Sequence, residues 1–485
     1  MSSASFEPSM ILAILPEILI LFLAAIVMTL DLVLSEERRA GLGWITAGGL
    51  LAIIGVSLAV GLPGAEPRLV WGGMLRQDWL GFVFKITFLF AAAITAMFST
   101  DLARMGKRGE FYLLMLSSTL GMTLMASAAD LIMLYLAIET TSIPLYILAG
   151  FLTRDDKSTE SGFKYLLFGA MTSTVMVYGF SLLYGFAGTT SLYSLAERLM
   201  SGELPIVPLF GGLLLVMVGF GFKISAVPLH FWAPDTYEGA PTPITGFLST
   251  ASKAAGFAVL LRVLMVAFPP EIAPLWAALI AAISTATMTL GNTLALAQRN
   301  IKRMLAYSSI AHAGYALIGL VAVSGLGIAS SVFYLVVYVI TNLTAFGVVS
   351  AFGRVSGSDE IAAYAGLSRR SPWIALTLMV ALLSLSGMPP FGGFVVKFAV
   401  FAAAVQAGQV WLAVVGVLNS IIGLYYYLSV LKVVYLYRSE EENQPLPITR
   451  LYALALSVLV IGIILLGTVF APWFSVSNSA AAALF

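Results

Sequence analysis

Apolar runs of about 20 residues follow one another along most of this 485-residue chain. An α-helix needs about 20 apolar residues to cross the hydrocarbon layer of a bilayer. Only 10% of the residues are charged, whereas about a quarter are charged in an ordinary water-soluble domain. The runs therefore predict an all-α protein that crosses a membrane many times.

The spacing of the runs predicts about fourteen transmembrane helices. We expect them at residues 10–33, 42–62, 78–100, 111–128, 130–151, 163–187, 207–228, 243–267, 273–297, 302–323, 328–353, 373–405, 410–436 and 450–472. The connections Ala126–Asp130 and Val323–Ile328 are very short, so the helices that they join should pack antiparallel.

Basic residues in the connections predict the orientation, because they concentrate on the cytoplasmic side of a membrane protein. Connections after odd-numbered helices carry 17 Lys and Arg residues, and those on the other side carry four, Arg262 among them. Both termini should therefore face the periplasm. The Ala- and Gly-rich composition favours a bacterial inner membrane.

The composition excludes several kinds of site. The chain has no cysteine, so it can hold neither a thiolate-bound iron–sulfur cluster nor a disulfide. Its two histidines, His230 and His312, have no spacing typical of a haem pair. A net charge of +1 gives no indication of a nucleic-acid partner. The first residues lack the basic start of a secretory signal, so the first apolar run should remain as a helix.

Four ionisable residues fall near the middle of predicted helices: Glu139, Lys223, Lys253 and Lys397. Each costs about 2.5–3.5 kcal/mol at the bilayer centre on insertion scales. A packing ion pair between Glu139 and Lys223 would leave the other two lysines without a partner. We therefore expect a hydrated polar file through the middle of the bundle. Lys85, by contrast, should reach the nearer surface by extending its side chain.

All three deep cations are lysines, and this choice favours proton exchange. Burial favours the neutral form of a lysine, and a nearby carboxylate favours the charged form. A change at the carboxylate would therefore switch the lysine between holding and releasing a proton. An arginine stays charged and could not do this.

Prolines predict breaks beside these charges. Pro144 follows Glu139 by five residues, and Pro228 follows Lys223 by five. A proline inside a helix displaces the carbonyl four residues earlier and leaves it free for water. The segment Gly387–Gly393 contains Pro389 and Pro390 and cannot form a regular helix. Simple kinks for packing are the alternative explanation.

The two halves of the chain correspond in spacing. Glu139 and Lys223 are 84 residues apart, and His312 and Lys397 are 85 apart. Each pair occupies the second and fourth helices of a five-helix set, and the two sets enter the membrane from opposite sides, as an inverted repeat requires. We therefore expect four parts. They are residues 1–110 (three helices), 111–270 and 271–440 (the repeats) and 441–485 (a last helix).

Four further polar residues leave alternatives open. His312 suits a proton relay, but it could also be a hydrogen-bonded core residue. His230 is expected in a loop or gate. Asp235 and Glu238 could belong to that gate or could simply order the connection Leu229–Thr242. Glu17 should lie at the membrane interface.

Three stretches resemble the signatures of the antiporter-like membrane subunits of respiratory complex I, the NADH:quinone oxidoreductase. They are Val227–Pro243 running on to Ala251–Ala255, Lys302–Tyr315 and Leu385–Phe398. Three features are similar to the N-type branch of this family. They are Lys397, a chain that ends after the predicted fourteenth helix, and the opening Leu15-Pro16-Glu17.

The resemblance implies two inverted five-helix repeats, broken helices seven and twelve, and proton transfer from Glu139 and Lys223 through Lys253 and His312 to Lys397. It also implies membrane-arm and peripheral-arm partner subunits that hold FMN, iron–sulfur clusters and quinone, with no cofactor in this chain. Two other functions share the fold: a cation/proton antiporter, and a membrane subunit of a hydrogenase or a plastid-type dehydrogenase. A sodium site would need clustered carboxylates at depth, and the sequence supplies only Glu139.

Overall fold

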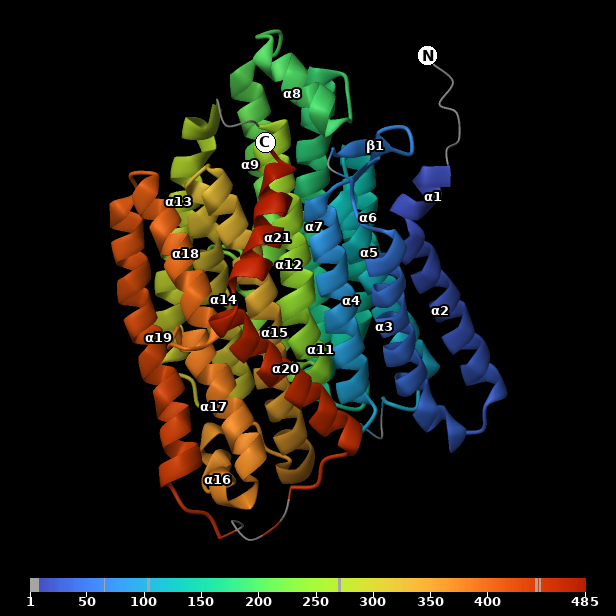
Figure 1. The fold of residues 1–485 in the computed structure, drawn as a ribbon, viewed down its shortest axis with the longest axis vertical. Coiled ribbons are helices and arrows are strands. Elements are labelled where there is room, and N and C mark those ends of the chain that lie inside the picture. The colour runs from blue at the N-terminus through green and yellow to red at the C-terminus, as the bar shows by residue number, and fades with distance from the viewer. Residues whose placement is uncertain (1–7, 65, 103–104, 269–271, 441–443, 445) are drawn as a thin grey trace.

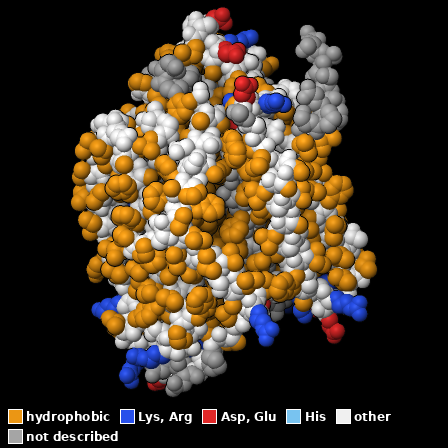
Figure 2. Space-filling view, in the orientation of Figure 1, with side chains coloured by type: hydrophobic (Ala, Val, Ile, Leu, Met, Phe, Trp, Pro, Cys, Tyr) orange, Lys and Arg blue, Asp and Glu red, His pale blue; other side chains and the backbone are white. Residues whose placement is uncertain are grey.

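The computed structural model describes residues 8–485 apart from 65, 103–104, 269–271, 441–443 and 445. Long helices run side by side along the molecule (Figure 1). Hydrophobic side chains cover the middle of the surface, and charged side chains gather toward its two ends (Figure 2). This distribution fits a bundle that spans a bilayer with its charged ends in water.

Among the described residues, twelve helical segments are long and apolar enough to cross a membrane. They are α2 (Leu15–Val33), α3 with its 3₁₀ start (Arg38–Val60), α4 (Trp79–Ser99), α6 (Leu131–Ala149), α7 (Asp156–Ala187), α9 (Ile206–Ile224), α11 to η3 (Thr242–Ala267), α13 (Ala273–Ala295), α14 (Ile301–Val321), α15 (Gly325–Ser356), α19 (Val410–Leu436) and α20 (Arg450–Thr468). The predicted fourth helix is the more polar α5 (Gly109–Ser127), and the predicted twelfth is the pair α17 (Pro372–Ser386) and α18 (Gly392–Gln406). Every predicted segment is therefore a helix or a broken pair of helices.

Several short elements were not predicted. They are α1 (Pro8–Ala13), β1 (Arg68–Val70), β2 (Leu75–Gln77), α8 (Leu192–Met200), α10 (Trp232–Gly239), η5 (Ile361–Tyr364), α16 (Leu367–Arg370) and α21 (Ala471–Ala482). The predicted all-α fold is confirmed, with one short antiparallel hairpin, β1 and β2, beside the helices. Trp71, Gly72 and Gly73 all have positive φ angles in its turn, a conformation that glycine adopts most readily.

Four segments form the centre of the bundle: α4, α11 to η3, α14 and α15. Their most apolar stretches are 78–100% buried, whereas those of α2, α3, α7, α13 and α19 are only 28–39% buried. The outer helices therefore present apolar faces to lipid or to other chains. The inner ones can carry polar groups without exposing them to hydrocarbon.

Both ends of the described chain lie at one end of the bundle. Figure 1 places α1 and the C-terminal end of α21 there, as an even number of crossings requires. The last predicted helix, residues 450–472, corresponds to α20, which ends earlier at Thr468. A separate helix, α21, follows it and packs against α15 and α4.

Two charged residues lie deeper than the sequence indicated. Arg262 was assigned to a connection, but it is fully buried and forms a bidentate pair with Asp78, at 2.6 and 3.0 Å. Lys85 does not extend to the surface. It is paired at 2.9 Å with Glu17, which is itself buried rather than interfacial. Opposite charges from distant segments satisfy one another here, and single-helix reasoning could not foresee these partners.

Candidate functional site

Glu139 lies on α6 at mid-membrane depth, but at the edge of the bundle. The residue is half-buried, and its carboxylate accepts a short hydrogen bond from Ser173 of α7. The expected position in the middle of the bundle is therefore wrong for this residue. Leu136 and Ile143, which lie on either side of it along α6, are each more than half exposed. Glu139 thus belongs to a face that another chain can cover.

Pro144 does not break its helix, contrary to the prediction. α6 runs without interruption from Leu131 to Ala149 with Pro144 inside. The hydroxyls of Thr140, Thr141 and Ser142 each donate to a carbonyl one turn earlier. In addition, Gly121 of α5 lies so close that a Cβ there would be 2.5 Å from the backbone nitrogen of Thr141. Neighbouring helices and hydroxyl groups hold a proline-containing membrane helix together in this way.

Lys223 lies in the last turn of α9 and is buried. Its ammonium donates a 2.6 Å hydrogen bond to the hydroxyl of Ser142 on α6. Ser142 is one turn along α6 from Glu139, yet Glu139 and Lys223 do not form an ion pair. Each of the two side chains is hydrogen-bonded to its own serine, so Glu139 and Lys223 interact electrostatically without direct contact.

The helix that carries Lys223 ends at the predicted break. α9 stops at Ile224, and Ser225 adopts the left-handed conformation, with Pro228 and the buried His230 in the irregular stretch that follows. The segment predicted as the connection Leu229–Thr242 instead forms the helix α10. A break inside one membrane helix explains this, because the chain resumes a helix after the proline.

Lys253 lies at the centre of the molecule, at the start of α12 (Lys253–Arg262). The five residues before it form a π-helical turn, η2 (Leu248–Ser252). Such turns are frequent at functional sites. Its ammonium donates to the Ser309 carbonyl at 2.8 Å and to the Ser309 hydroxyl. No described carboxylate forms an ion pair with it.

His312 lies one turn beyond Ser309 on α14 and contacts two tyrosine hydroxyls. Its Nδ1 is 2.6 Å from the Tyr334 hydroxyl, and its Nε2 is 3.3 Å from the Tyr427 hydroxyl. The Tyr427 hydroxyl also bonds Ser308. Every polar atom of the imidazole thus has a partner that can donate or accept a proton.

Lys397 lies on α18, beyond the second break. Pro389 and Pro390 fall between the end of α17 at Ser386 and the start of α18 at Gly392. The ammonium reaches back across the break to the Ser386 carbonyl at 3.1 Å, and it lies 4.7 Å from the centre of the Tyr315 ring. Gly387 has φ +89°, and a Cβ there would come within 2.9 Å of the lysine side chain, so only glycine fits.

One face of α14 joins the central lysine to the last one. Ser309, His312 and Tyr315 are spaced three residues apart and contact Lys253, the tyrosine hydroxyls and Lys397 in turn. On the other side, Gly256 of α12 packs against the Lys223 side chain, where a Cβ would come within 3.1 Å of it. The buried lysines therefore follow one another through the bundle.

A small cavity adjoins this row. It measures about 10 Å³ and is lined by His312, Tyr334, Thr341 and Ser384 among others. That space suits about one water molecule, and the lining supplies several polar partners for it.

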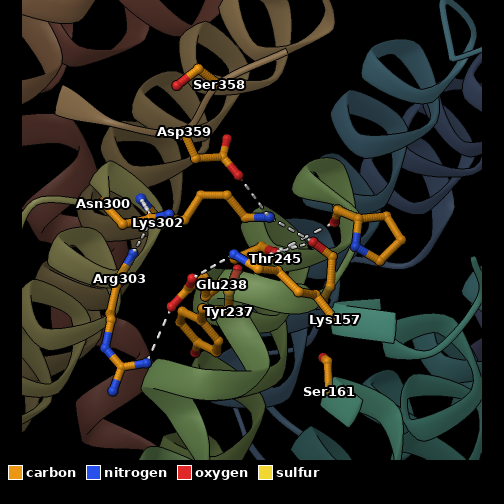
Figure 3. A network of polar contacts seen from close by, with 12 residues as sticks. Lys157, Ser161, Tyr237, Glu238, Thr245, Asn300, Lys302, Arg303, Ser358 and Asp359 are labelled. Carbon is orange, nitrogen blue, oxygen red and sulfur yellow. Dashed lines mark hydrogen bonds and ion pairs between the residues drawn. The ribbon is translucent and has the colours of Figure 1, made fainter. Parts of the chain in front are cut away.

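A charged network ties α10 to its neighbours (Figure 3). Glu238 pairs with Lys157 of α7 at 3.1 Å and with Arg303 of α14 at 3.2 Å. Asp235 pairs with Lys164 at 2.6 Å and with Arg303 at 2.7 Å. Burial raises the pKa of both carboxyls, but the hydrogen bonds from these cations outweigh it and hold each pKa below its ordinary value. Both acids are therefore ionised at neutral pH.

The same network reaches the C-terminal end of α10. Buried Lys302 donates to the Ala240 carbonyl at 2.9 Å and lies 3.7 Å from the Asp359 carboxylate (Figure 3). Lysine near a helix C-terminus stabilises the exposed carbonyls there. Asp235 and Glu238 thus hold α10 to α7 and α14.

Sequence reasoning missed a further chain of hydrogen-bonded polar side chains. Beside Lys397, the Tyr315 hydroxyl accepts from Asn292 of α13 at 3.0 Å, and Asn292 donates to Asn419 of α19 at 3.3 Å. Asn419 in turn donates to Thr289, an exposed residue, at 3.3 Å. Two asparagines inside apolar helices were the available signal, because amides at bilayer depth are costly unless they are paired.

Within the described residues, no group of three or more His, Asp or Glu side chains is arranged to hold a metal ion. Residues 128–423 match the family model of the NADH:quinone oxidoreductase/Mrp antiporter transmembrane region. The chain belongs to this family. The match covers the span from the start of α6 to the middle of α19, and thus every residue of the lysine row.

Relatives within this family resemble the chain over nearly its whole length. Subunit N of the NADH-quinone oxidoreductase from Moorella thermoacetica is 43% identical over 93% of this chain and 94% of that protein. Subunit N from Heliobacterium modesticaldum is 42% identical over 93% and 94%. The predicted N-type branch is thereby confirmed.

Solved structures of the family show the same fold. A chain of respiratory complex I from Thermus thermophilus with bound aureothin is 33% identical and covers 95% of this chain and 98% of its own, with a TM-score of 0.80. A chain of the Mrp complex from Dietzia has a TM-score of 0.84 over 97% of both chains at 20% identity. That last likeness concerns the fold alone.

Proposed function

We propose that the chain carries protons across a bacterial inner membrane as the N-type membrane subunit of NADH:quinone oxidoreductase. The observation that carries this proposal is the row of buried lysines, each with a hydroxyl, carbonyl or aromatic partner in place of a fixed counter-ion. Electron transfer from NADH to quinone belongs to partner subunits, which would hold FMN, iron–sulfur clusters and the quinone. We place both termini on the periplasmic side, because the basic connections lie at the other end.

In this proposal the cycle starts at Glu139. A change in the charge near Glu139 alters how strongly the carboxylate favours the protonated form of Lys223. A released proton moves from Lys223 toward Lys253, and from there past Ser309 and His312 to Lys397. Hydroxyl and imidazole groups can pass a proton by accepting on one side and donating on the other. Buried lysines suit the transfer, because their environment decides whether they hold the proton.

The test is Lys253→Met in the assembled enzyme, with protons moved per NADH oxidised measured in sealed vesicles. Methionine keeps the side-chain length and removes the ionisable group. We expect an assembled complex with lost or reduced pumping.

The double variant Glu17→Gln/Lys85→Met is the matched control. It removes a buried lysine together with its partner at a position outside the row, and it should pump normally. Unchanged stoichiometry and rate in Lys253→Met would overturn the role of Lys253 as a carrier.

A further inference from the structure

A large basic cavity lies at the end of the molecule opposite α1. It measures about 780 Å³ and opens between three connections: α2 to α3, α4 to α5, and α6 to α7. Its lining consists of Leu34, Ser35, Glu36, Arg39, Lys107, Arg108, Phe151, Leu152, Thr153 and Arg154. The volume is typical of a small-molecule site.

The lining carries a surplus of positive charge. Four cations, Arg39, Lys107, Arg108 and Arg154, face one acid, Glu36. Arg39 is partly engaged by Asp31 at 3.5 Å. In the part of the chain that the structure describes, Lys107 and Arg154 are exposed and form no ion pair. The cavity thus offers at least two cations to an anion.

Apolar groups adjoin the cations, and they distinguish this cavity from a site for a free anion. Phe151 and Leu152 form part of its wall. Leu32 and Val33, at the end of α2 just before the cavity, are 75% and 76% exposed. Trp44, near the start of α3 at the same end, is 55% exposed and marks the depth of the membrane interface.

We propose that this cavity binds the phosphate-bearing headgroup of an acidic phospholipid. The phosphate lies among Lys107, Arg154 and their basic neighbours, and an acyl chain leaves along Leu32 and Val33 into the bilayer. Basic pockets between membrane helices on the cytoplasmic side bind acidic lipid headgroups by the same physics. The bound lipid joins the N-terminal three helices to the α6–α7 connection, and α6 carries Glu139.

Photocrosslinking of the assembled complex tests the site. The complex is placed in phosphatidylcholine nanodiscs that contain a photoreactive phosphatidylglycerol or, separately, a photoreactive phosphatidylcholine, and labelled peptides are mapped by mass spectrometry. We expect phosphatidylglycerol to label the three connections and phosphatidylcholine to label them weakly. An excess of inorganic phosphate should not displace the lipid.

Two variants with the same loss of charge sharpen the test. Lys107→Gln/Arg154→Gln should lower labelling of the connections about tenfold, because each cation near an anionic lipid surface contributes appreciably to binding. Arg299→Gln/Arg438→Gln removes two exposed cations at the same end but outside the cavity, and it should change labelling little. A native gel checks that both assemble.

Three outcomes would overturn the proposal. One is equal labelling by the two lipids in the unmodified complex, which needs no variant at all. The second is complete displacement by inorganic phosphate, which would indicate a site for a free anion. The third is labelling that is blocked because a protein segment of another subunit occupies the cavity, as chemical crosslinking between subunits would reveal.

Discussion

The two broken helices place their lysines in similar surroundings from opposite sides of the break. Lys223 belongs to the half-helix before its break and lies in the last turn, where the helix dipole favours a cation. Lys397 belongs to the half-helix after its break, but its ammonium reaches back to the last carbonyl of α17. Both ammonium groups therefore lie at the C-terminal end of the first half-helix.

The partners of the two lysines differ. Lys223 has a carboxylate, Glu139, one helical turn from its serine partner. Lys397 has the ring of Tyr315 and, within the described residues, no acid paired with it. A carboxylate can change its charge, whereas a ring cannot. In the proposed cycle, Lys223 therefore responds to a change of charge at Glu139, whereas Lys397 holds and releases a proton without a neighbouring acid.

The largest effect should come from arginine at either lysine. Lys223→Arg and Lys397→Arg keep the positive charge but remove the ability to give up a proton. We expect proton translocation to fall about a hundredfold, the scale on which acid–base groups usually contribute. The measurement is the initial rate of vesicle acidification driven by NADH, with Lys432→Arg as the surface control. Normal pumping by either variant would show that Lys223 and Lys397 do not have equivalent parts in proton transfer.

Glu139→Gln should have the next largest effect, because it removes the one charge that distinguishes the first half. We expect NADH:quinone turnover to slow about tenfold, equal to roughly 1.4 kcal/mol of barrier. Ser173→Ala keeps the carboxylate and should slow turnover much less. Turnover of Glu139→Gln at the normal rate would assign this residue to packing.

A smaller effect is expected at Tyr315, whose ring supports the Lys397 ammonium. Cation–π contacts contribute about 2 kcal/mol when desolvated, and phenylalanine keeps most of this. Tyr315→Leu should therefore lower the pumping rate several-fold, whereas Tyr315→Phe should lower it less. If the two variants are equally slow, then the hydroxyl bonded to Asn292 matters and the ring does not; if both pump normally, then neither group matters.

The smallest effect concerns pH and the network around α10. The pKa values of Asp235 and Glu238 are lower in the folded protein than in an unfolded chain. The pairs therefore stabilise the fold at every pH above the ordinary carboxyl value near 4, and the stabilisation is lost as the pH falls through the lowered values. We expect the difference in melting temperature between the unmodified complex and Asp235→Asn to stay constant from pH 6 to 8. A difference that grows or shrinks across that range would contradict the pairing.

The transmembrane helices and the buried lysines could be predicted from the sequence, because the length of an apolar run and a charge within it are local signals. Lys223, Lys253 and Lys397 all proved to be buried, and the breaks at Pro228 and at Pro389–Pro390 came where proline and glycine required them. Pro144 was misjudged, because hydroxyl bonds within α6 and close packing by α5 together hold its helix.

Partners from distant segments were beyond local reasoning. Asp78 and Arg262 are 184 residues apart, and nothing in either stretch indicates the other. The short helix α10 was missed for a similar reason, since its fixation depends on cations from α7 and α14. Tyr315 ends the family-like stretch Lys302–Tyr315, but its position beside Lys397 depends on how α14 and α18 pack.

The position of Glu139 at the edge of the bundle determines how a neighbouring molecule can influence its carboxylate electrostatically. A charge on a neighbouring chain packed against this face would act strongly on that carboxylate, since two unit charges interact far more strongly in protein than in water. No helix within the chain then has to slide or tilt for a change of charge outside the chain to act on Glu139. In the proposed cycle, Glu139 thus receives the signal at a fixed place on the edge of the bundle, and only protons move inward.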